Sequence, residues 1–161
     1  MQISKYRVLF AVTFLVIAAG SARAQSDRYV DNYYPKPALV EVYKARASTM
    51  NKVARHHRIG FVLGVVKDIS SKPYPAHVAV FAKGKGATKL IIVSQVAGRL
   101  DTIFRVRAYL AMLTSSARMT PIFQKMKVED RFTFLDLIKM LGFKSVTVSD
   151  GDTFAHQIVV Q

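Results

Sequence analysis

The chain has 161 residues, of which 51% are hydrophobic and 21% are charged, and this balance excludes an intrinsically disordered protein. Lysine and arginine number 24 against 10 aspartates and glutamates, so the net charge of +14 predicts association with an anionic neighbour. Because the chain has no cysteine, disulfides, thiolate metal sites and thiol chemistry are excluded.

The first 24 residues have the three parts of a secretory signal peptide. Lys5 and Arg7 make a positively charged start, residues 8–19 form an uncharged apolar run, and Ala22 and Ala24 are the small residues that precede a cleavage site. The apolar run is shorter than the roughly 20 residues that cross a bilayer core, so an uncleaved membrane anchor is the weaker alternative. We expect cleavage after Ala24 and a periplasmic mature chain with 21 cations against 10 carboxylates.

A tyrosine-rich segment at 25–37 follows the predicted cleavage site. It ends in two prolines, which restrict the backbone and predict an extended arm. Its rings can pack on the domain itself or on a partner, and they belong to Tyr29, Tyr33 and Tyr34. Residues 38–161 fit a single α/β domain of ordinary size.

The first part of this domain contains two segments of ambiguous pattern. Residues 38–58 have apolar side chains near helical spacing, so we expect a helix whose end carries the dense cationic cluster from Lys52 to Arg58. Residues 59–66, with the sequence IGFVLGVV, form a continuous apolar run that predicts a strand buried on both faces. Prolines and serines in residues 68–75 then predict a loop.

The next segments form a predicted β-hairpin. Residues 76–83 and 88–94 are apolar runs typical of strands, and the sequence Gly-Lys-Gly-Ala between them is typical of a turn. The second run contains four consecutive aliphatic residues, which indicate a buried strand.

Three helices are predicted in the second half of the domain. Apolar residues recur every three or four positions across residues 100–117, as in an amphipathic helix. A threonine followed by proline opens a short helix at 120–127. Another helix at 133–142 begins where Thr133 and Asp136 match a capping box and ends at a glycine.

The chain closes with two predicted strands, at 144–149 and 154–160. Their apolar faces match only if the loop between them has an odd number of residues, and a three-residue loop containing Gly151 would place Val148 opposite Phe154. The predicted fold class is therefore α/β (α+β), a single layered domain with about five mostly buried strands and two or three helices packed on the sheet.

The closing hairpin also holds the residue types of a hydrolase triad, in Ser149, Asp150, Asp152 and His156. However, no G-x-S-x-G elbow surrounds the serine, and Asp-Gly is common turn chemistry. His156 alternates with apolar strand residues, which favours a partly buried imidazole whose hydrogen-bonding groups are satisfied. We therefore expect these residues to serve the fold, and we predict no catalytic residue.

Metal and cofactor motifs are also missing. The histidines are His56, His57, His77 and His156, and no two of them stand at the i,i+4 spacing of a helical metal pair. The glycine- and lysine-rich run at 83–89 lacks the spacing of a phosphate-binding loop and leads into a strand instead of a helix. We predict no metal site and no cofactor.

Two groups of cations form the predicted binding surface. One recurs at every third residue of the expected helix end, and the other crowds the tip of the first hairpin. The predicted binding residues are Lys52, Arg55, Arg58, Lys83, Lys85 and Lys89. Because an exported protein does not meet nucleic acid in the cytoplasm, we expect the partner to be an anionic envelope component or an acidic protein surface. Any contact with a membrane would be peripheral. The alternative is that the charge serves solubility alone.

Four runs of the sequence carry a resemblance to known proteins. They are RIGFV at 58–62, PYPAHVAVFAKG at 73–84, KLIIV at 89–93 and MLGFKSVTVSDGDTFAHQ at 140–157. With these runs the chain resembles small exported proteins of alphaproteobacteria, some of which carry the name molybdopterin-guanine dinucleotide biosynthesis protein. The resemblance covers most of the mature chain and implies no particular catalytic residues.

Two functions from different classes follow. The first is an exported periplasmic binding or accessory domain that uses its basic surface toward an anionic partner without catalysis. The alternative is an enzyme, either the nucleotidyltransferase that the resemblance implies or an unrecognised hydrolase that acts through the closing hairpin.

Overall fold

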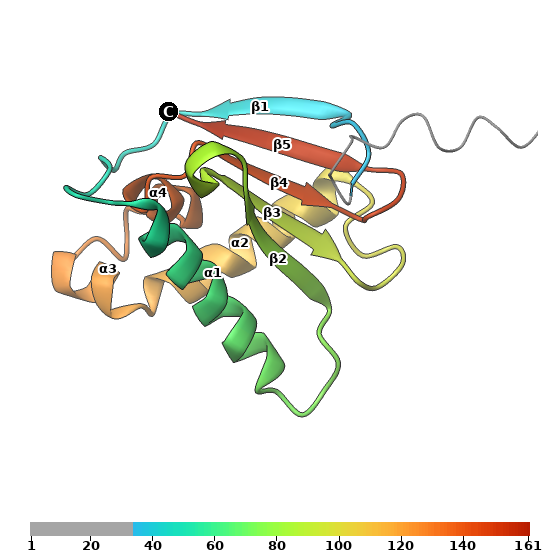
Figure 1. The fold of residues 1–161 in the computed structure, drawn as a ribbon, viewed down its shortest axis with the longest axis horizontal. Coiled ribbons are helices and arrows are strands. Elements are labelled where there is room, and N and C mark those ends of the chain that lie inside the picture. The colour runs from blue at the N-terminus through green and yellow to red at the C-terminus, as the bar shows by residue number, and fades with distance from the viewer. Residues whose placement is uncertain (1–33) are drawn as a thin grey trace, which may run out of the picture.

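The computed structural model describes residues 34–161, so the predicted signal peptide and most of the predicted arm lie outside the described residues. The described part of the chain forms a five-stranded mixed sheet with four α-helices packed on it (Figure 1). In chain order the elements are β1 (Leu39–Tyr43), α1 (Arg55–Ser70), β2 (Val78–Lys83), the short 3-10 helix η1 (Lys85–Ala87), β3 (Lys89–Ser94), α2 (Ile103–Arg118), α3 (Pro121–Met126), α4 (Phe134–Met140), β4 (Ser145–Ser149) and β5 (Ala155–Val160). The α/β class is as predicted, with more helices than expected.

The strands lie in the order β1-β5-β4-β3-β2. Two antiparallel hairpins, β2-β3 and β4-β5, are joined side by side through the parallel pair of β3 and β4. The strand β1 adds to the free side of β5 in parallel, so β1 and β2 are the edges of the sheet.

The helices cover one face of this sheet. Val62 of α1, Val106 of α2 and Leu137 of α4 belong to one buried cluster with Leu90 and Val146 of the sheet. Burial of each such side chain contributes about 1.5–3 kcal/mol, so this layer holds the domain together.

The other face of the sheet carries a smaller apolar cluster. Ile91, Val93 and Ala155 are buried there together with Tyr34, and Phe81 packs against them. The end of the predicted arm therefore packs on its own domain at Tyr34, whereas Tyr29 and Tyr33 lie outside the described residues.

Two predictions for the first part of the domain are wrong. Residues 39–43, which we expected in a helix, form β1, and residues 59–66, which we expected in a strand, lie inside α1. In β1, the apolar Val40 and Val42 point to the exposed side and are 56% and 57% exposed. The buried side of this edge strand therefore carries few of the alternating apolar residues that normally indicate a strand. The helix α1 is apolar on most of its sides, so it shows neither the helical nor the strand period.

The three helices predicted in the second half of the chain are confirmed. The helices α2, α3 and α4 lie within about three residues of the expected bounds, and Thr133 and Asp136 form the expected capping box. Asp136 is completely buried and does more than cap. Its Oδ1 accepts the backbone N–H of Arg46 at 2.7 Å and its Oδ2 accepts the Tyr43 hydroxyl at 2.9 Å, so this carboxylate fastens the end of β1 to α4.

The closing hairpin forms with a longer loop than predicted. The loop spans residues 150–154, and Val148 lies opposite His156 and not opposite Phe154. The loop length is still odd, so the two apolar faces match as expected. The extra residues are held by Asp150, whose Oδ1 accepts backbone N–H groups from Asp152, Thr153 and Phe154 at 2.9 to 3.0 Å.

Candidate functional site

The two predicted cationic segments meet at one corner of the molecule. Nε and Nη2 of Arg58, in the first turn of α1, donate to the carbonyl oxygen of Gly86 in η1 at 3.0 and 2.8 Å. This contact joins positions that are 28 residues apart in the sequence. Residues 52–58 and 83–89 together are called the basic corner below.

Arg58 holds this corner together from inside. It is only 8% exposed, although we predicted it on the binding surface. A Cβ at Gly142, which has a φ of +73°, would come within 2.9 Å of Nη1 of Arg58, so the chain after α4 also closes on the guanidinium. Arg58 therefore links α1, η1 and the turn after α4 and does not face solvent.

The other predicted cations are accessible, with one exception. Lys52, Arg55, Lys85 and Lys89 are exposed and take part in none of the salt bridges within residues 34–161. Lys83 is half-buried and lies directly opposite Lys89 on the face of the sheet away from the helices. Like charges at this cross-strand spacing repel each other.

The cationic cluster of residues 52–58 lies at the start of α1, whereas we expected it at the end of a helix. The first turn holds no acidic residue, and its exposed side chains are Arg55, His56 and His57. A helix N-terminus carries about half a positive charge from its free amides, so the cation Arg55 is repelled by the helix dipole. His57 offsets part of this cost, because its Nδ1 accepts the Ala54 N–H at 3.1 Å.

Sequence reasoning missed Lys144, which belongs to the same corner. Its backbone N–H donates to the carbonyl oxygen of Thr88 at 2.7 Å, just before β3 and β4 pair in parallel, and its side chain is exposed. Only the parallel pairing of strands far apart in the chain brings Lys144 to this corner, and no local signal predicts that pairing.

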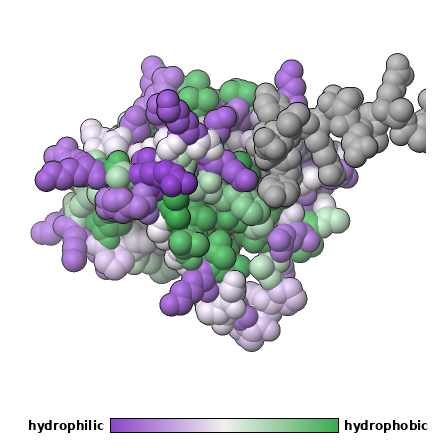
Figure 2. Space-filling view, viewed as in Figure 1, coloured by the Kyte–Doolittle hydropathy of each residue, from purple (hydrophilic) through white to green (hydrophobic). Residues whose placement is uncertain are grey.

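Exposed apolar side chains continue from the basic corner along α1. Leu63 is 62% exposed and Val66 is 38% exposed, and the cation Lys67 follows them. Figure 2 shows this arrangement on one face of the molecule: hydrophilic side chains gather over the start of α1 and over η1, and apolar side chains lie next to them where α1 runs beside β2.

A wide apolar groove lies on the opposite flank of α1, between α1 and α2. It encloses about 1280 Å³, and strands β2 and β3 form its floor. Its walls include Phe61 and Val65 of α1 and Tyr109, Met112 and Leu113 of α2. Sequence analysis missed this groove because it assigned residues 59–66 to a strand in the sheet.

Four charged side chains line the groove. Asp68 and Lys72 lie in the last turn of α1 and just after it, and Arg99 and Arg105 lie just before α2 and in its first turn. Lys72 pairs with Asp68 at 3.5 Å and Arg105 with Asp101 at 2.7 Å, whereas Arg99 makes no ion pair within the described part of the chain. Burial raises the pKa of Tyr109, and the nearby Arg99 acts in the opposite direction.

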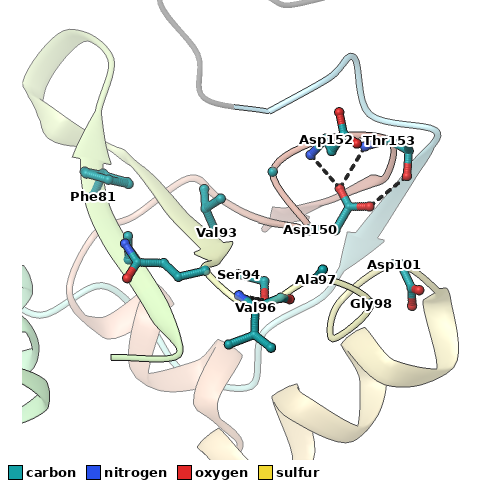
Figure 3. A pocket seen from close by; sticks show the side chains of 13 residues that line it. Phe81, Val93, Ser94, Val96, Ala97, Gly98, Asp101, Asp150, Asp152 and Thr153 are labelled. Atoms are coloured by element: carbon teal, nitrogen blue, oxygen red, sulfur yellow. Dashed lines mark hydrogen bonds between the residues drawn. The ribbon is translucent and has the colours of Figure 1, made fainter. Parts of the chain in front are cut away.

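A smaller cavity of about 600 Å³ opens on the other face of the sheet, where β3 and β4 end (Figure 3). The carboxyl ends of parallel strands are favoured ligand positions in α/β sheets. However, Asp150 accepts four hydrogen bonds from its own loop, and Asp101 pairs with Arg105. These loop bonds outweigh burial and lower the pKa of Asp150, so this carboxylate is committed to the turn.

The triad suggested by residue type does not form. Ser149 lies opposite Ala155 on one face of the sheet, and its Oγ donates to the carbonyl oxygen of Phe154 at 2.7 Å. His156 faces the helices on the other side of the sheet and is completely buried. Its Nε2 lies 3.3 Å from Oε2 of Glu41, whose Oε1 accepts from Arg107 at 2.8 Å.

His156 is less well satisfied than we expected. Its contact with Glu41 does not have the geometry of a hydrogen bond, so within residues 34–161 neither Nε2 nor Nδ1 has a hydrogen-bond partner. Burial lowers the pKa of His156, although the Glu41 carboxylate raises it in part. An uncharged, inaccessible imidazole of this kind belongs to the core, where it contributes packing and costs polar desolvation.

The histidines do not assemble into a metal site. Within the described residues no three histidine, aspartate or glutamate side chains lie close enough to hold an ion. His56 and His57 contact each other with ring centroids 4.0 Å apart, and His77 stacks on Tyr74.

Comparisons of the whole chain with protein-family models, with curated proteins and with solved structures give no match. Within residues 34–161, no helix has both the length and the apolar character needed to span a membrane.

Proposed function

We propose that this protein is an exported, non-catalytic binding domain that docks through its basic corner on the anionic lipid surface of a membrane. The convergence of two cationic segments at one corner carries the proposal, because the contact between Arg58 and Gly86 unites charges that are remote in the sequence. The predicted signal peptide supports a periplasmic location for this docking.

The cost of assembling the corner supports a functional role for its charge. Lys83 lies opposite Lys89, and Arg55 lies at the positive end of a helix dipole. Charge that served only solubility could be spread over the surface without these repulsions. An anionic surface relieves them when it binds.

The shape of the corner favours an extended partner over a small anion. Its cations come from the start of α1 and from the β2-β3 hairpin, and neither described cavity lies at the corner. The exposed Leu63 and Val66 beside it suit a lipid surface, because cations next to apolar side chains are typical of helices that lie at a membrane interface.

Vesicle co-sedimentation tests the proposal. The double variant Lys52→Asn and Arg55→Gln, made in the mature protein, should bind vesicles with anionic headgroups about 30-fold more weakly than the wild type, since each cation near such a surface contributes about 1 kcal/mol. Asparagine is chosen at position 52 because Lys52 has a φ of +63°, which asparagine tolerates.

The matched control removes the same charge elsewhere. Arg118→Gln and Lys125→Gln change two exposed cations on α2 and α3 and should leave the affinity nearly unchanged. Equal losses for the two double variants would contradict docking through the corner, because they would mean that only the net charge matters. Binding that does not weaken as salt rises would contradict it as well.

A further inference from the structure

The apolar groove between α1 and α2 has the form of a ligand site that is open in this structure. Its floor contains Val80, Leu90 and Ile92, which are buried core residues of the sheet. Ligand sites in proteins usually enclose about 300–1000 Å³ and are lined mostly by apolar side chains, and this groove has comparable apolar walls and a larger volume.

Two glycines in the middle of α1 keep the groove wide. Gly60 and Gly64 both line it, and a Cβ at either position would meet no atom within 4 Å. Neither glycine is needed for a close contact within the described residues. Glycine in a helix interior is unfavourable, so this open wall comes at a cost to the stability of α1.

Arg99 and Tyr109 form a polar, positively charged part of the otherwise apolar groove. The exposed Arg99 lies close enough to influence the ionisation of Tyr109, whose hydroxyl has no hydrogen-bond partner within the described part of the chain. Lys72 and Arg105 lie on the same lining. The surroundings of Arg99 and Tyr109 therefore attract an anion, while the apolar walls of the groove exclude water from an apolar chain.

We propose that the groove binds a long-chain carboxylic acid, with its alkyl chain between α1 and α2 and its carboxylate at Arg99 and Tyr109. The carboxylate of such a ligand matches the charge of Arg99, and its alkyl chain matches the apolar walls of the groove. This site is separate from the basic corner and does not depend on docking to a membrane.

Calorimetric titration of the mature protein with saturated carboxylates, from octanoate to hexadecanoate below their micelle concentrations, tests the proposal. Each buried methylene should raise the affinity about fourfold until the groove is filled, after which longer chains gain nothing. Arg99→Gln should weaken dodecanoate binding about tenfold and leave binding of the uncharged dodecanol unchanged.

Filling the groove gives a second test with a matched control. Gly64→Phe adds a ring on the groove side of α1 and should abolish dodecanoate binding, whereas Leu63→Phe adds bulk on the exposed side and should not. Phenylalanine has a better helix propensity than glycine, so the variant should fold. The Lys52→Asn and Arg55→Gln double variant should bind dodecanoate normally, which separates this site from membrane docking.

Three results would overturn the proposal. One is the absence of saturable binding for every chain length. Another is dodecanoate binding that Gly64→Phe leaves intact, because the chain would then lie elsewhere. A third is a dimer of the wild type that Gly64→Phe dissociates, without dodecanoate binding, because a second copy would then occupy the groove.

Discussion

Replacing Asp136 with asparagine should destabilise the protein strongly, although the two side chains have nearly the same shape. The carboxylate accepts hydrogen bonds from Arg46 N, Tyr43 Oη, Thr133 N and Thr133 Oγ1 at 2.7 to 2.9 Å, and it is completely buried. An asparagine amide would turn an NH₂ group toward some of these donors and leave them unpaired.

The size of the effect follows from those bonds. A hydrogen bond to a charged group contributes about 1.5–3 kcal/mol, and a buried donor left unpaired costs about 1–3 kcal/mol. Loss of the charge and of one or two acceptors at Asp136 should therefore cost about 3–5 kcal/mol. For a domain of this size, about 4 °C of melting temperature corresponds to 1 kcal/mol, so the melting temperature should fall by about 12–20 °C.

Urea and thermal unfolding of wild type and Asp136→Asn measure this cost, with the exposed Asp130→Asn as a control that should change stability by less than about 0.5 kcal/mol. Burial opposes the ionisation of Asp136, but its hydrogen bonds outweigh burial and lower its pKa in the folded state. The ionised carboxylate thus stabilises the wild type at pH values above the pKa of an aspartate in the unfolded chain, about 3.9. This stabilisation is lost as the pH falls through the pKa of Asp136 in the folded protein. The gap between wild type and variant should be constant above about pH 5 and narrow in acid. A gap below 1 kcal/mol at pH 7 would refute the assigned role.

Three further predictions concern stability. Gly64→Ala should raise the free energy of unfolding by about 1 kcal/mol in urea titrations, because its Cβ meets no atom, and a loss of stability would mean that Gly64 packs closely. Arg58→Met should remove both bonds to Gly86, cost about 2–3 kcal/mol and speed proteolytic cleavage in η1, whereas unchanged cleavage would contradict the clamp. The pKa of His156 is lowered on folding, so the unfolded chain binds the proton more tightly and stability should fall as pH drops below about 6.5. His156→Gln should flatten that dependence relative to wild type in urea midpoints from pH 7.5 to 5.5, and parallel curves would rule out this origin.

The sequence predicted those elements whose signals are local. The helix α4 has a capping box at Thr133 and Asp136, the strand β3 has a run of aliphatic residues, and α2 has a helical repeat. Each of these signals arises within a few residues and does not depend on what packs against the element. The alternation of apolar residues in β4 and β5 also predicted that the loop between them has an odd number of residues. The loop is nevertheless longer than the Asp-Gly turn signal suggested, because Asp150 accepts four hydrogen bonds within it.

The wrong predictions of a helix at β1 and a strand at α1 have a physical cause. β1 is an edge strand with Val40 and Val42 on the more exposed side, so its sequence does not show the usual alternation of buried apolar and exposed polar residues. α1 is apolar around most of its circumference. A helix of that kind normally contacts something on several sides, and within the described residues α1 packs mainly beside β2 and η1. The sequence thus found the exposed cations of the corner, and it missed Lys144 and the groove because both depend on non-local packing.

The most direct test of docking through the basic corner is backbone hydrogen exchange of the mature protein with and without vesicles that carry anionic headgroups. If the protein docks through the basic corner, bound vesicles should slow exchange at residues 52–58 and 83–89 and leave α3 unaffected. Protection confined to other elements, with exchange at both cationic segments unchanged, would contradict it.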